Sequence, residues 1–447
     1  MRKNSLMSKL VVLVLSIGMI ATSSVVSFAG STAPAKAKIK SAKALSISEI
    51  QIKWNKIDKN CDGYQLARDG KVIKTFTSKK TVSYKDTDLA QLTTYKYKVR
   101  AYNKVNGKKV YGNYSAVKTV KTLSGSKGWP EGGEEGFIPV DGGRVFYHLY
   151  GKDKTGTPLI FMHGGPGGTG NCFFKQIALA EERPVVIYNQ LGSAGSDFAD
   201  EITTADEAQK YLTIEHYVDE AQTVVDYFNF DEFILVGRSW GTMLAAEYAA
   251  AKQPEGLKGI VLDGPFLNVD TWCEDAQRLI QSLPEMDVCN EKMDGKRMWE
   301  VVQECEASGA FYEDERYSVI NDIYSSYFNS RFENADSNVG TPSDSAVTQH
   351  RVSGVSVYNY MWGPSEFSCT GTLKGHDTTC LLSNINVPIL YICGQYDSGS
   401  PEAAQKYFAK TNKGEITVLP GCAHNASRER PDEFNTAISA FAKRLAK

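Results

Sequence analysis

The period of hydrophobic and polar positions changes along the chain and divides it into regions. Between residues 36 and 123, apolar and polar residues alternate in short runs such as Ile50–Trp54 and Tyr95–Tyr102. Turn residues such as Asp69-Gly70 separate these runs. A period of two is typical of strands with one buried face. About seven such runs predict an all-β sandwich.

Three positions of this β-region follow a recognisable pattern. Trp54 stands in an early strand, and Leu89 and Tyr95 precede and begin a later one. Together with the closing run Val120–Thr122, they make residues 36–123 resemble a fibronectin type III module, a family that buries such a tryptophan and has a tyrosine corner. The resemblance implies a sandwich fold. It implies little about function, because such modules serve as spacers and as binders of many kinds.

From residue 135 onward, continuous apolar runs alternate with amphipathic segments such as Ile214–Phe228. This order is typical of a parallel sheet with helices on both faces. The alternation stops between Pro265 and Thr372, where helical spacing replaces it, and we expect a helical cap inserted between two parts of the sheet. The apolar runs expected to form strands are Leu159–Met162, Val185–Tyr188, Phe233–Val236, Ile260–Leu262, Ile389–Cys393 and Ile416–Leu419. The helical patterns of the insertion are Glu274–Leu283, Lys296–Ala307 and Glu315–Asn329.

The N-terminus has the features of an export signal. Arg2, Lys3 and Lys9 flank the start of an apolar run, Leu10–Ile20, that is short for a membrane span, and Ser27-Phe28-Ala29 offers small residues for cleavage. The alternative is an uncleaved N-terminal anchor. No later stretch is long and apolar enough to be transmembrane. We therefore expect a protein that is secreted or held at the cell surface or cell wall.

These observations predict five regions. They are a signal peptide at 1–29, a fibronectin type III-like module at 36–123, a linker at 124–134, an α/β core at 135–265 and 373–447, and a helical cap at 266–372. The linker is rich in Gly, Ser and charged residues. At 447 residues, the chain is long enough for two or three domains.

Charge is distributed unevenly between these regions. Residues 36–124 contain 21 Lys and Arg against 6 Asp and Glu, although the whole chain has a net charge of -2. One interpretation is that the basic module binds an anionic cell-wall polymer. The other is that it is a spacer with a solvated basic surface. We expect no nucleic-acid partner.

The chain has nine cysteines, an odd number for an exported protein with every cysteine paired. Five lie in or beside the insertion, which is compatible with one or two disulfides there. They are Cys273, Cys289, Cys305, Cys369 and Cys380. No Cys-x-x-Cys motif and no cluster with metal-ligand spacing occurs. We therefore expect neither a metal site nor a cofactor.

The most informative motif is Gly237-Arg238-Ser239-Trp240-Gly241. It follows the apolar run Phe233–Val236 and precedes an Ala-rich run, Thr242–Lys252. A Gly-x-Ser-x-Gly turn between a strand and a helix is the signature of a nucleophile elbow. The serine then sits at a helix N-terminus, where developing negative charge is favoured. We expect Ser239 to be a catalytic nucleophile.

A serine nucleophile requires a base and an acid, and in the hydrolase arrangement these follow it in the order acid and then histidine. Of the histidines after Ser239, His424 lies just beyond the last predicted strand, where a short loop returns it to the serine. Asp397 follows the strand Ile389–Cys393 and is the expected acid. Asp263, directly after an earlier strand, is the rival.

An oxyanion site is predicted from two backbone N–H groups. One belongs to Trp240, the residue after the nucleophile, and the other to Gly165 in the loop His163–Gly168. The glycines of this loop allow close approach of a substrate oxygen. A phosphate-binding role fits poorly, because Pro166 removes a donor and no Gly-Lys-Ser/Thr follows. We expect a structural role for His163.

With these motifs in place, residues 135–447 resemble the proline iminopeptidase family of α/β-hydrolases, which are serine peptidases. The resemblance implies an α/β-hydrolase fold with a helical cap insertion, so that 135–265 and 373–447 form an α/β-hydrolase core. His163–Gly168, the elbow and Met361–Phe367 carry the resemblance, whereas Asn189 and Arg238 depart from the family pattern. The resemblance implies that Glu366 binds the free α-amino group of the substrate. It also implies a second cap glutamate, for which Glu333 is the candidate.

The leading hypothesis is an exported serine aminopeptidase that releases N-terminal proline or another residue from peptides or aminoacyl substrates through an acyl-enzyme. Two alternatives remain open. One is an esterase or amidase on the same scaffold that needs no free amine. The other is a wall-binding protein whose hydrolase domain is vestigial.

Overall fold

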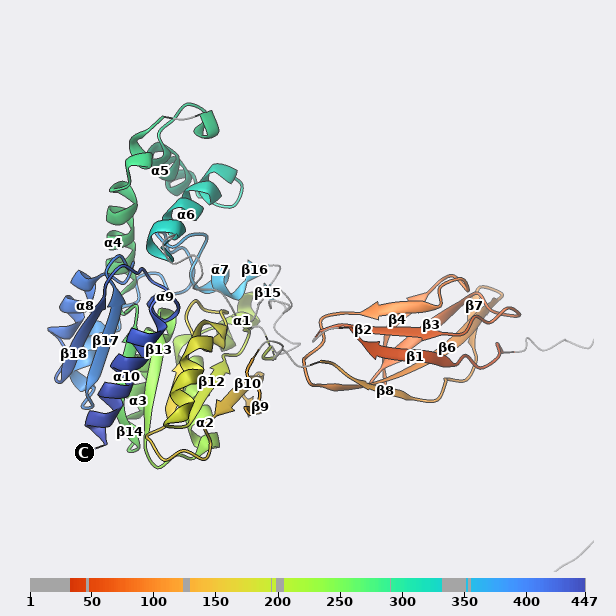
Figure 1. Cartoon of the computed structure of the whole chain (residues 1–447). Helices are drawn as coiled ribbons and strands as arrows, with labels where there is room; N and C mark the ends of the chain where they lie inside the picture. Colours follow the sequence, from red (N-terminus) through yellow and green to blue (C-terminus); the bar gives the residue numbers. More distant parts are fainter. Residues whose placement is uncertain are drawn as a thin grey trace, which may run out of the picture. The chain divides into compact units, whose positions relative to one another are not determined.

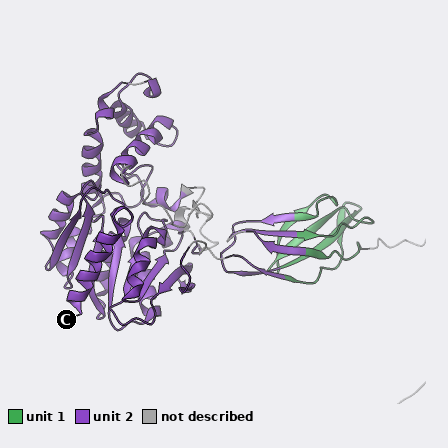
Figure 2. Cartoon of the chain, viewed as in Figure 1, with its two compact units in different colours: residues 1–40, 53–83, 97–118 green, residues 41–52, 84–96, 119–447 purple. Residues whose placement is uncertain are grey.

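A computed structural model describes residues 33–45, 48–123, 129–193, 195–197, 205–289, 291–331, 351–352 and 355–446 (Figure 1). The chain divides into two compact units: residues 1–40, 53–83 and 97–118 form one, and residues 41–52, 84–96 and 119–447 form the other (Figure 2). The predicted signal peptide lies outside the described residues.

The N-terminal region consists of β-strands arranged in two sheets. β1 (Ile39–Ala44), β2 (Ile50–Trp54) and β5 (Ser83–Asp86) form one sheet. A second sheet has the order β4-β3-β6-β7, with β8 paired to β6; its strands are β3 (Gly63–Arg68), β4 (Lys71–Phe76), β6 (Thr94–Val105), β7 (Lys108–Tyr111) and β8 (Lys118–Lys121). The Ala90 N–H donates to the Tyr95 hydroxyl at 2.8 Å, which is the kind of bond a tyrosine corner makes. The all-β class is therefore observed, and the fibronectin type III assignment stays a prediction.

The larger unit contains an eight-stranded sheet in the order β18-β17-β14-β13-β11-β12-β10-β9. Six neighbouring strands, β18, β17, β14, β13, β11 and β12, pair in parallel. The antiparallel hairpin of β9 and β10 extends the sheet beyond β12. Their bounds are β9 (Glu134–Val140), β10 (Gly143–Tyr150), β11 (Leu159–Met162), β12 (Val185–Asn189), β13 (Phe233–Arg238), β14 (Leu257–Asp263), β17 (Ile389–Gly394) and β18 (Gly414–Leu419). The predicted α/β fold is confirmed.

Both faces of this sheet are buried, which explains why its central strands are apolar throughout. In β13, Phe233 and Leu235 belong to the core on one face, whereas Ile234 and Val236 belong to the core on the other. Helices α2 (Ile214–Phe228) and α3 (Trp240–Lys252) cover the first face, and η1 (Gly170–Glu181) and α10 (Pro431–Leu445) cover the second. The remaining core helices are α1 (Ala205–Tyr211), η6 (Thr379–Asn384), α8 (Pro401–Phe408) and α9 (Ala426–Glu429).

The packing of this unit begins before the predicted hydrolase boundary. Trp129 is buried and stacks on His148, with 3.8 Å between ring centroids. Residues 124–128 of the predicted linker lie outside the described part of the chain, whereas Trp129 packs into the hydrolase core. The linker is therefore shorter than residues 124–134 at its C-terminal end.

A helical insertion separates β14 from β17, as Figure 1 shows above the sheet. It comprises α4 (Val269–Gln281), η2 (Pro284–Asp287), η3 (Glu291–Met293), α5 (Met298–Ser308), α6 (Glu315–Phe328), β15 (Arg351–Val352), β16 (Val355–Ser356) and α7 (Val357–Met361). Helix α4 begins five residues before the periodic pattern does, because the Asn268 side chain caps it by accepting from Thr271 N at 2.7 Å.

All nine cysteines are free. The expectation of one or two disulfides in the insertion is therefore wrong. Cys305 and Cys369 are buried, and Cys305 donates to the Asp314 carboxylate at 3.6 Å. These side chains fill space in a packed helical cap, a role that needs no crosslink. None of the described helices is long and apolar enough to cross a membrane.

Candidate active site

Ser239 occupies a strained turn between β13 and α3. Its φ of 52° and ψ of -122° lie in a region that side-chain-bearing residues rarely adopt. The strain is tolerated because the chain is tightly packed around the turn, and a Cβ atom on Gly241 would overlap the carbonyl oxygen of Met162. The elbow predicted from the sequence therefore has the backbone geometry that exposes a serine at the edge of the sheet.

His424 and Asp397 form a buried hydrogen-bonded pair. The distance from His424 Nδ1 to Asp397 Oδ1 is 2.7 Å, and Gly399 N donates to the same carboxylate oxygen at 2.7 Å. Burial lowers the pKa of His424, but the charge and hydrogen bond of Asp397 outweigh it, so that the pKa is raised above 6.5. This bond orients the imidazole and directs its other nitrogen away from Asp397.

Asp263, the rival acid, has a different partner. It is fully buried, and its Oδ2 lies 3.7 Å from Arg238 Nε. Burial raises the pKa of Asp263 to about 6, against the opposing charge of Arg238. The structure therefore joins Asp397 to His424 and assigns Asp263 to the elbow arginine.

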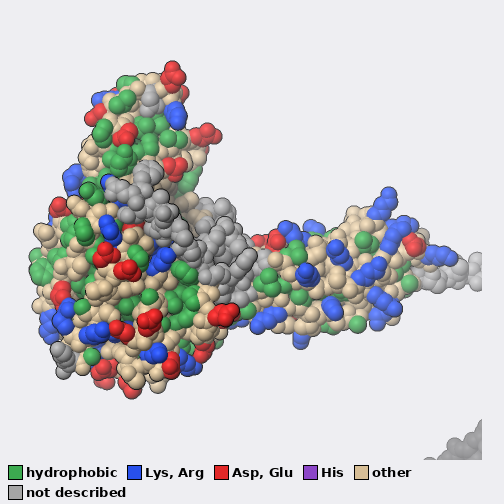
Figure 3. Space-filling model, viewed as in Figure 1, with side chains coloured by type: hydrophobic (Ala, Val, Ile, Leu, Met, Phe, Trp, Pro, Cys, Tyr) green, Lys and Arg blue, Asp and Glu red, His purple; other side chains and the backbone are tan. Residues whose placement is uncertain are grey.

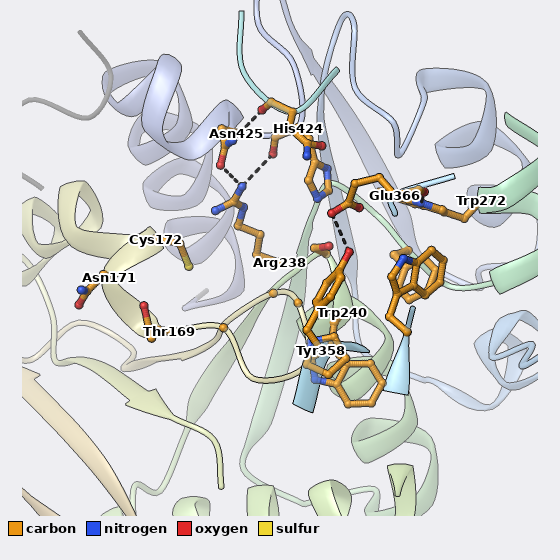
Figure 4. Close-up of a pocket in the computed structure, with 18 of the residues that line it drawn as sticks. Thr169, Asn171, Cys172, Arg238, Trp240, Trp272, Tyr358, Glu366, His424 and Asn425 are labelled. Carbon is orange, nitrogen blue, oxygen red and sulfur yellow. Dashed lines mark hydrogen bonds between the residues drawn. The ribbon is translucent and has the colours of Figure 1, made fainter. Parts of the chain in front are cut away.

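Arg238 lies beside the loop that carries His424 and is almost fully buried. Its Nη2 donates to the carbonyl oxygen of His424 at 3.4 Å and to Oδ1 of Asn425 (Figure 4). With the ion pair to Asp263, these contacts fix the guanidinium beside the loop that carries the histidine. Arg238 therefore links the elbow to the His424 loop through hydrogen bonds from its guanidinium group.

The glycine-rich loop lies directly against the nucleophile. A Cβ atom on Gly164 would be 2.8 Å from Ser239 Cβ, and Gly164, Gly165 and Trp240 line the same cavity as Ser239. His163 is fully buried, accepts from Gln190 N at 3.0 Å, and has its pKa lowered to about 4 by burial. A neutral histidine in these bonds supports the loop and does not face the cavity.

Glu366 lines the same cavity from the cap. The Tyr358 hydroxyl donates to its Oε1 at 2.7 Å (Figure 4). Its backbone is also fixed, since Trp272 Nε1 donates to its carbonyl at 2.8 Å and its N–H donates to Asn321 Oδ1 at 3.2 Å. Burial and the nearby Glu366 charge raise the pKa of Tyr358 well above 10, so that it remains a donor. Glu333 lies outside the described residues.

The cavity that these side chains share has a volume of about 290 Å³. Aromatic rings form much of its cap side, and Glu366 is the one carboxylate among its described lining residues. The lining residues are Gly164, Gly165, Pro166, Gly168, Thr169, Asn171, Cys172, Arg238, Ser239, Trp240, Phe266, Trp272, Asn329, Tyr358, Trp362, Glu366, Leu373, His424, Asn425 and Arg428. Across the described ranges, no group of His, Cys, Asp and Glu side chains is arranged to hold a metal ion.

Comparison with known proteins decides which hydrolases this site belongs with. Residues 157–286 match the family model for the alpha/beta hydrolase fold. The chain is 33% identical over 310 residues to proline iminopeptidase of Heyndrickxia coagulans, a match that covers 69% of this chain and 98% of that one. The chain belongs to the proline iminopeptidase family. It is a serine hydrolase of the aminopeptidase type.

A second proline iminopeptidase sequence and two crystal structures are also similar to this chain. Proline iminopeptidase of Lactobacillus delbrueckii subsp. lactis is 27% identical over 292 residues, covering 65% of this chain and 91% of that one. The crystal structure of proline iminopeptidase of Mycobacterium smegmatis superposes with a TM-score of 0.57 at 25% identity, covering 70% and 98% of the two chains. The crystal structure of VinJ gives a TM-score of 0.59 at 26% identity, covering 70% and 99%.

In this family member, the cap and the histidine loop are joined edge to edge. His424 N donates to Phe328 O and Asn425 N to Asn329 O, each at 2.9 Å. The Asn425 side chain adds donations to Asn329 O at 2.7 Å and to Ser330 Oγ at 2.6 Å. The end of α6 therefore pairs with the backbone that carries the histidine.

Sequence reasoning missed two residues of this site, Asn425 and Tyr358, and considered Asp263 only as a rival catalytic acid. Asn425 accepts from Arg238 next to His424, and Tyr358 donates to Glu366. Asp263 forms an ion pair with Arg238. The position of Asn425 next to His424 was the one available signal. The partnerships of Tyr358 and Asp263 depend on contacts across the fold, for which the sequence carries no periodic or motif signal.

Proposed function

We propose that this chain is an exported serine aminopeptidase that releases N-terminal proline, or another single residue, from peptides through an acyl-enzyme. One observation carries the proposal. The strained serine elbow, the Asp397–His424 pair and a cap carboxylate, Glu366, converge on a single cavity. A nucleophile with its base and a charged group for an ammonium are the elements that such an enzyme requires.

In the proposed mechanism, His424 Nε2 accepts the proton of the Ser239 hydroxyl as Oγ attacks the first peptide carbonyl. Asp397 holds the imidazole in the required tautomer and stabilises the imidazolium. The N–H groups of Trp240 and Gly165 stabilise the oxyanion. His424 then protonates the leaving amine, and water, activated by the same histidine, attacks the acyl-enzyme and frees the amino acid.

Glu366 is proposed to bind the substrate's N-terminal ammonium. A charge-assisted hydrogen bond to one ammonium restricts cleavage to the first residue. The hydrogen bond from Tyr358 holds Oε1 of Glu366 in place, and the donation from its backbone N–H to Asn321 fixes the main chain at residue 366. Glu333 remains the proposed second carboxylate.

Export and surface attachment are further parts of the proposal. The signal-like residues 1–29 support export, and the basic N-terminal β-region supports attachment to an anionic wall polymer. Figure 3 shows Lys and Arg side chains spread over the visible face of this β-region. Secretion is tested by finding the protein in the culture medium or wall fraction. Attachment is tested by its salt-dependent sedimentation with purified cell walls, and sedimentation that salt does not reduce would contradict it.

The catalytic proposal is tested with prolyl and other aminoacyl arylamides and their N-acetylated forms. We expect turnover of the free amines, rejection of the acetylated forms, and loss of turnover in Ser239→Ala. Equal turnover of acetylated substrates would instead identify an esterase or amidase that needs no free amine. Failure of a fluorophosphonate probe to label the folded protein would identify a vestigial hydrolase domain.

A further inference from the structure

The charged groups of the active-site cavity are divided between its two ends. Glu366 lies at one end with Tyr358 and Trp272, and Arg238 lies toward the other with Asn171 and Cys172, with His424 between them (Figure 4). Arg428 lines the cavity as well. The nucleophile therefore lies in a cavity that carries a negative group and positive groups at separate places.

Arg428 belongs to the same part of the fold as Arg238, since its backbone N–H donates to Asn425 O at 2.8 Å and the Asn425 side chain accepts from Arg238. Burial raises the pKa of the Cys172 thiol, and the charges of Arg238 and Arg428 both oppose that rise. Both arginines also line the cavity together with Cys172. Cys172 lies in η1, directly after the glycine-rich loop that is proposed to hold the oxyanion. The cationic end therefore adjoins the reaction centre.

Arg238 is held in a fixed position. It contacts Asp263 at the end of β14, and the His424 carbonyl oxygen and the Asn425 side chain in the loop after β18. Asp263 is not among the cavity's lining residues, so it balances Arg238 from outside the cavity. Polar groups complete this end: Thr169 and Asn171 lie on the side of Cys172 (Figure 4), and the Asn329 carbonyl accepts from Asn425, the partner of Arg238.

These positions match the charges of a short peptide. In a dipeptide, the N-terminal ammonium and the C-terminal carboxylate lie on opposite sides of the scissile carbonyl, and the carboxylate belongs to the leaving group. A guanidinium binds a carboxylate with directed, charge-assisted hydrogen bonds. The cavity volume of about 290 Å³ is at the lower end of the range for ligand pockets, which suits a substrate of this size.

We propose that Arg238 and Arg428 form a carboxylate-binding subsite for the leaving group, and that the preferred substrates are short peptides with a carboxylate on their second residue. The inference rests on the proposed aminopeptidase function and specifies its substrate class. The carboxylate comes from the peptide's C-terminus or from an acidic side chain at the second position. Either source places a carboxylate at the same end of the cavity.

The wild-type enzyme tests this directly, with the N-terminal residue that gives the fastest arylamide turnover, proline in the proposed case. We compare Pro-Ala with Pro-Ala amide, and Pro-Glu amide with Pro-Gln amide. We expect kcat/KM to be about tenfold higher for a peptide with the carboxylate, in one pair or both. The pair that shows the preference identifies the source. Equal values within both pairs would overturn the proposal.

A variant assigns the preference to the arginines. Arg428→Gln should reduce the acid-to-amide ratio of kcat/KM to about one, and Arg428→Lys should restore part of it, because a lysine retains the charge but not the planar donor geometry. The matched control is Arg444→Gln, which removes an exposed arginine paired with Glu415 on the surface of α10. An unchanged ratio in Arg428→Gln would exclude Arg428 from the subsite.

Aminoacyl arylamides separate the two proposals, because they carry no carboxylate. Turnover of arylamides without an acid-over-amide preference would leave the aminopeptidase function standing and remove the subsite. No turnover of free-amine arylamides or peptides would remove both.

Discussion

Gly264 faces His424 so closely that a Cβ atom on residue 264 would lie 2.5 Å from the His424 Cε1 atom. Residue 264 also has a φ of 59°, which a side chain tolerates poorly. We therefore expect Gly264→Ala to displace the imidazole from Ser239. A displacement of about 1 Å lowers the rate on the order of a hundredfold, which kcat measurements on a prolyl arylamide will show.

Gly375→Ala is the matched control for this effect. Gly375 has a φ of 76°, but no atom lies within 4 Å of its Cβ position. It therefore introduces similar backbone strain far from any contact with His424. We expect a modest loss of thermal stability and normal kcat. If both variants lose activity equally, backbone strain, and not the His424 contact, is responsible.

The Asp397–His424 bond predicts a specific pH dependence. Catalysis needs neutral His424, and Asp397 raises the pKa of this imidazole above its ordinary value of 6.5. Activity should therefore fall as the pH drops through the raised pKa. In Asp397→Asn, burial and the charge of Arg238 lower the pKa of the imidazole against the weaker effect of Glu366, so the pKa falls. The acid limb of kcat/KM should therefore move to lower pH while the plateau drops by about 10⁴-fold. An acid limb at the wild-type position would show that another group titrates.

Glu366 should control the preference for a free amine. We expect Glu366→Gln to lower kcat/KM for free-amine arylamides by about ten- to a hundredfold, with a much smaller effect on N-acetylated forms, because only the former lose an ion pair. Tyr358→Phe removes the hydrogen bond that orients the carboxylate, and we expect a smaller effect of the same kind. Glu313→Gln, at an exposed position of the cap, is the control.

Glu220 makes stability depend on pH at a distance from the active site. Its carboxyl group is buried on α2, accepts from Leu191 N at 2.9 Å, and has its pKa raised by burial to about 8. Above about pH 4.5 the unfolded chain ionises this group while the folded protein keeps it protonated, so its contribution to stability falls as the pH rises to about 8. Glu220→Gln removes this term.

Relative to the wild type, Glu220→Gln should therefore gain stability between pH 5 and pH 9, on the order of a few kcal/mol. Thermal or urea unfolding at the two pH values measures the difference. Glu215→Gln, at an exposed position on the same helix, should show little change. A stability difference independent of pH would contradict a raised pKa for Glu220.

The parts of the site that the sequence predicted are those that depend on local order along the chain. Ser239 follows a strand and precedes a helix, and Asp397 and His424 follow the last two strands, so the topology of a parallel sheet is enough to bring them to one edge. The choice between Asp397 and Asp263 was open, because both follow neighbouring strands. Only the placement of the imidazole decides it, and that depends on the packing of Gly264 and Arg238.

Side-chain partnerships across the cap were beyond the reach of the sequence. Tyr358 and Glu366 meet because a short helix and the following loop fold back over the cavity, and no period or motif encodes that approach. The cysteines show the converse error, since the predicted export led us to expect disulfides. Cys305 instead packs inside a helical cap whose hydrophobic core already holds it together.

The pairing of Phe328 and Asn329 with His424 and Asn425 has a consequence for the diversification of such enzymes. The segment that closes the substrate cavity also completes the hydrogen bonding of the loop that carries the base. A different cap grafted onto this sheet would therefore leave the backbone N–H groups of His424 and Asn425 without acceptors. The exception is a cap that places carbonyl oxygens where those of Phe328 and Asn329 lie. The end of α6 and the loop that carries His424 therefore depend on each other. An exchange of caps between relatives should keep activity only when both segments are transferred together.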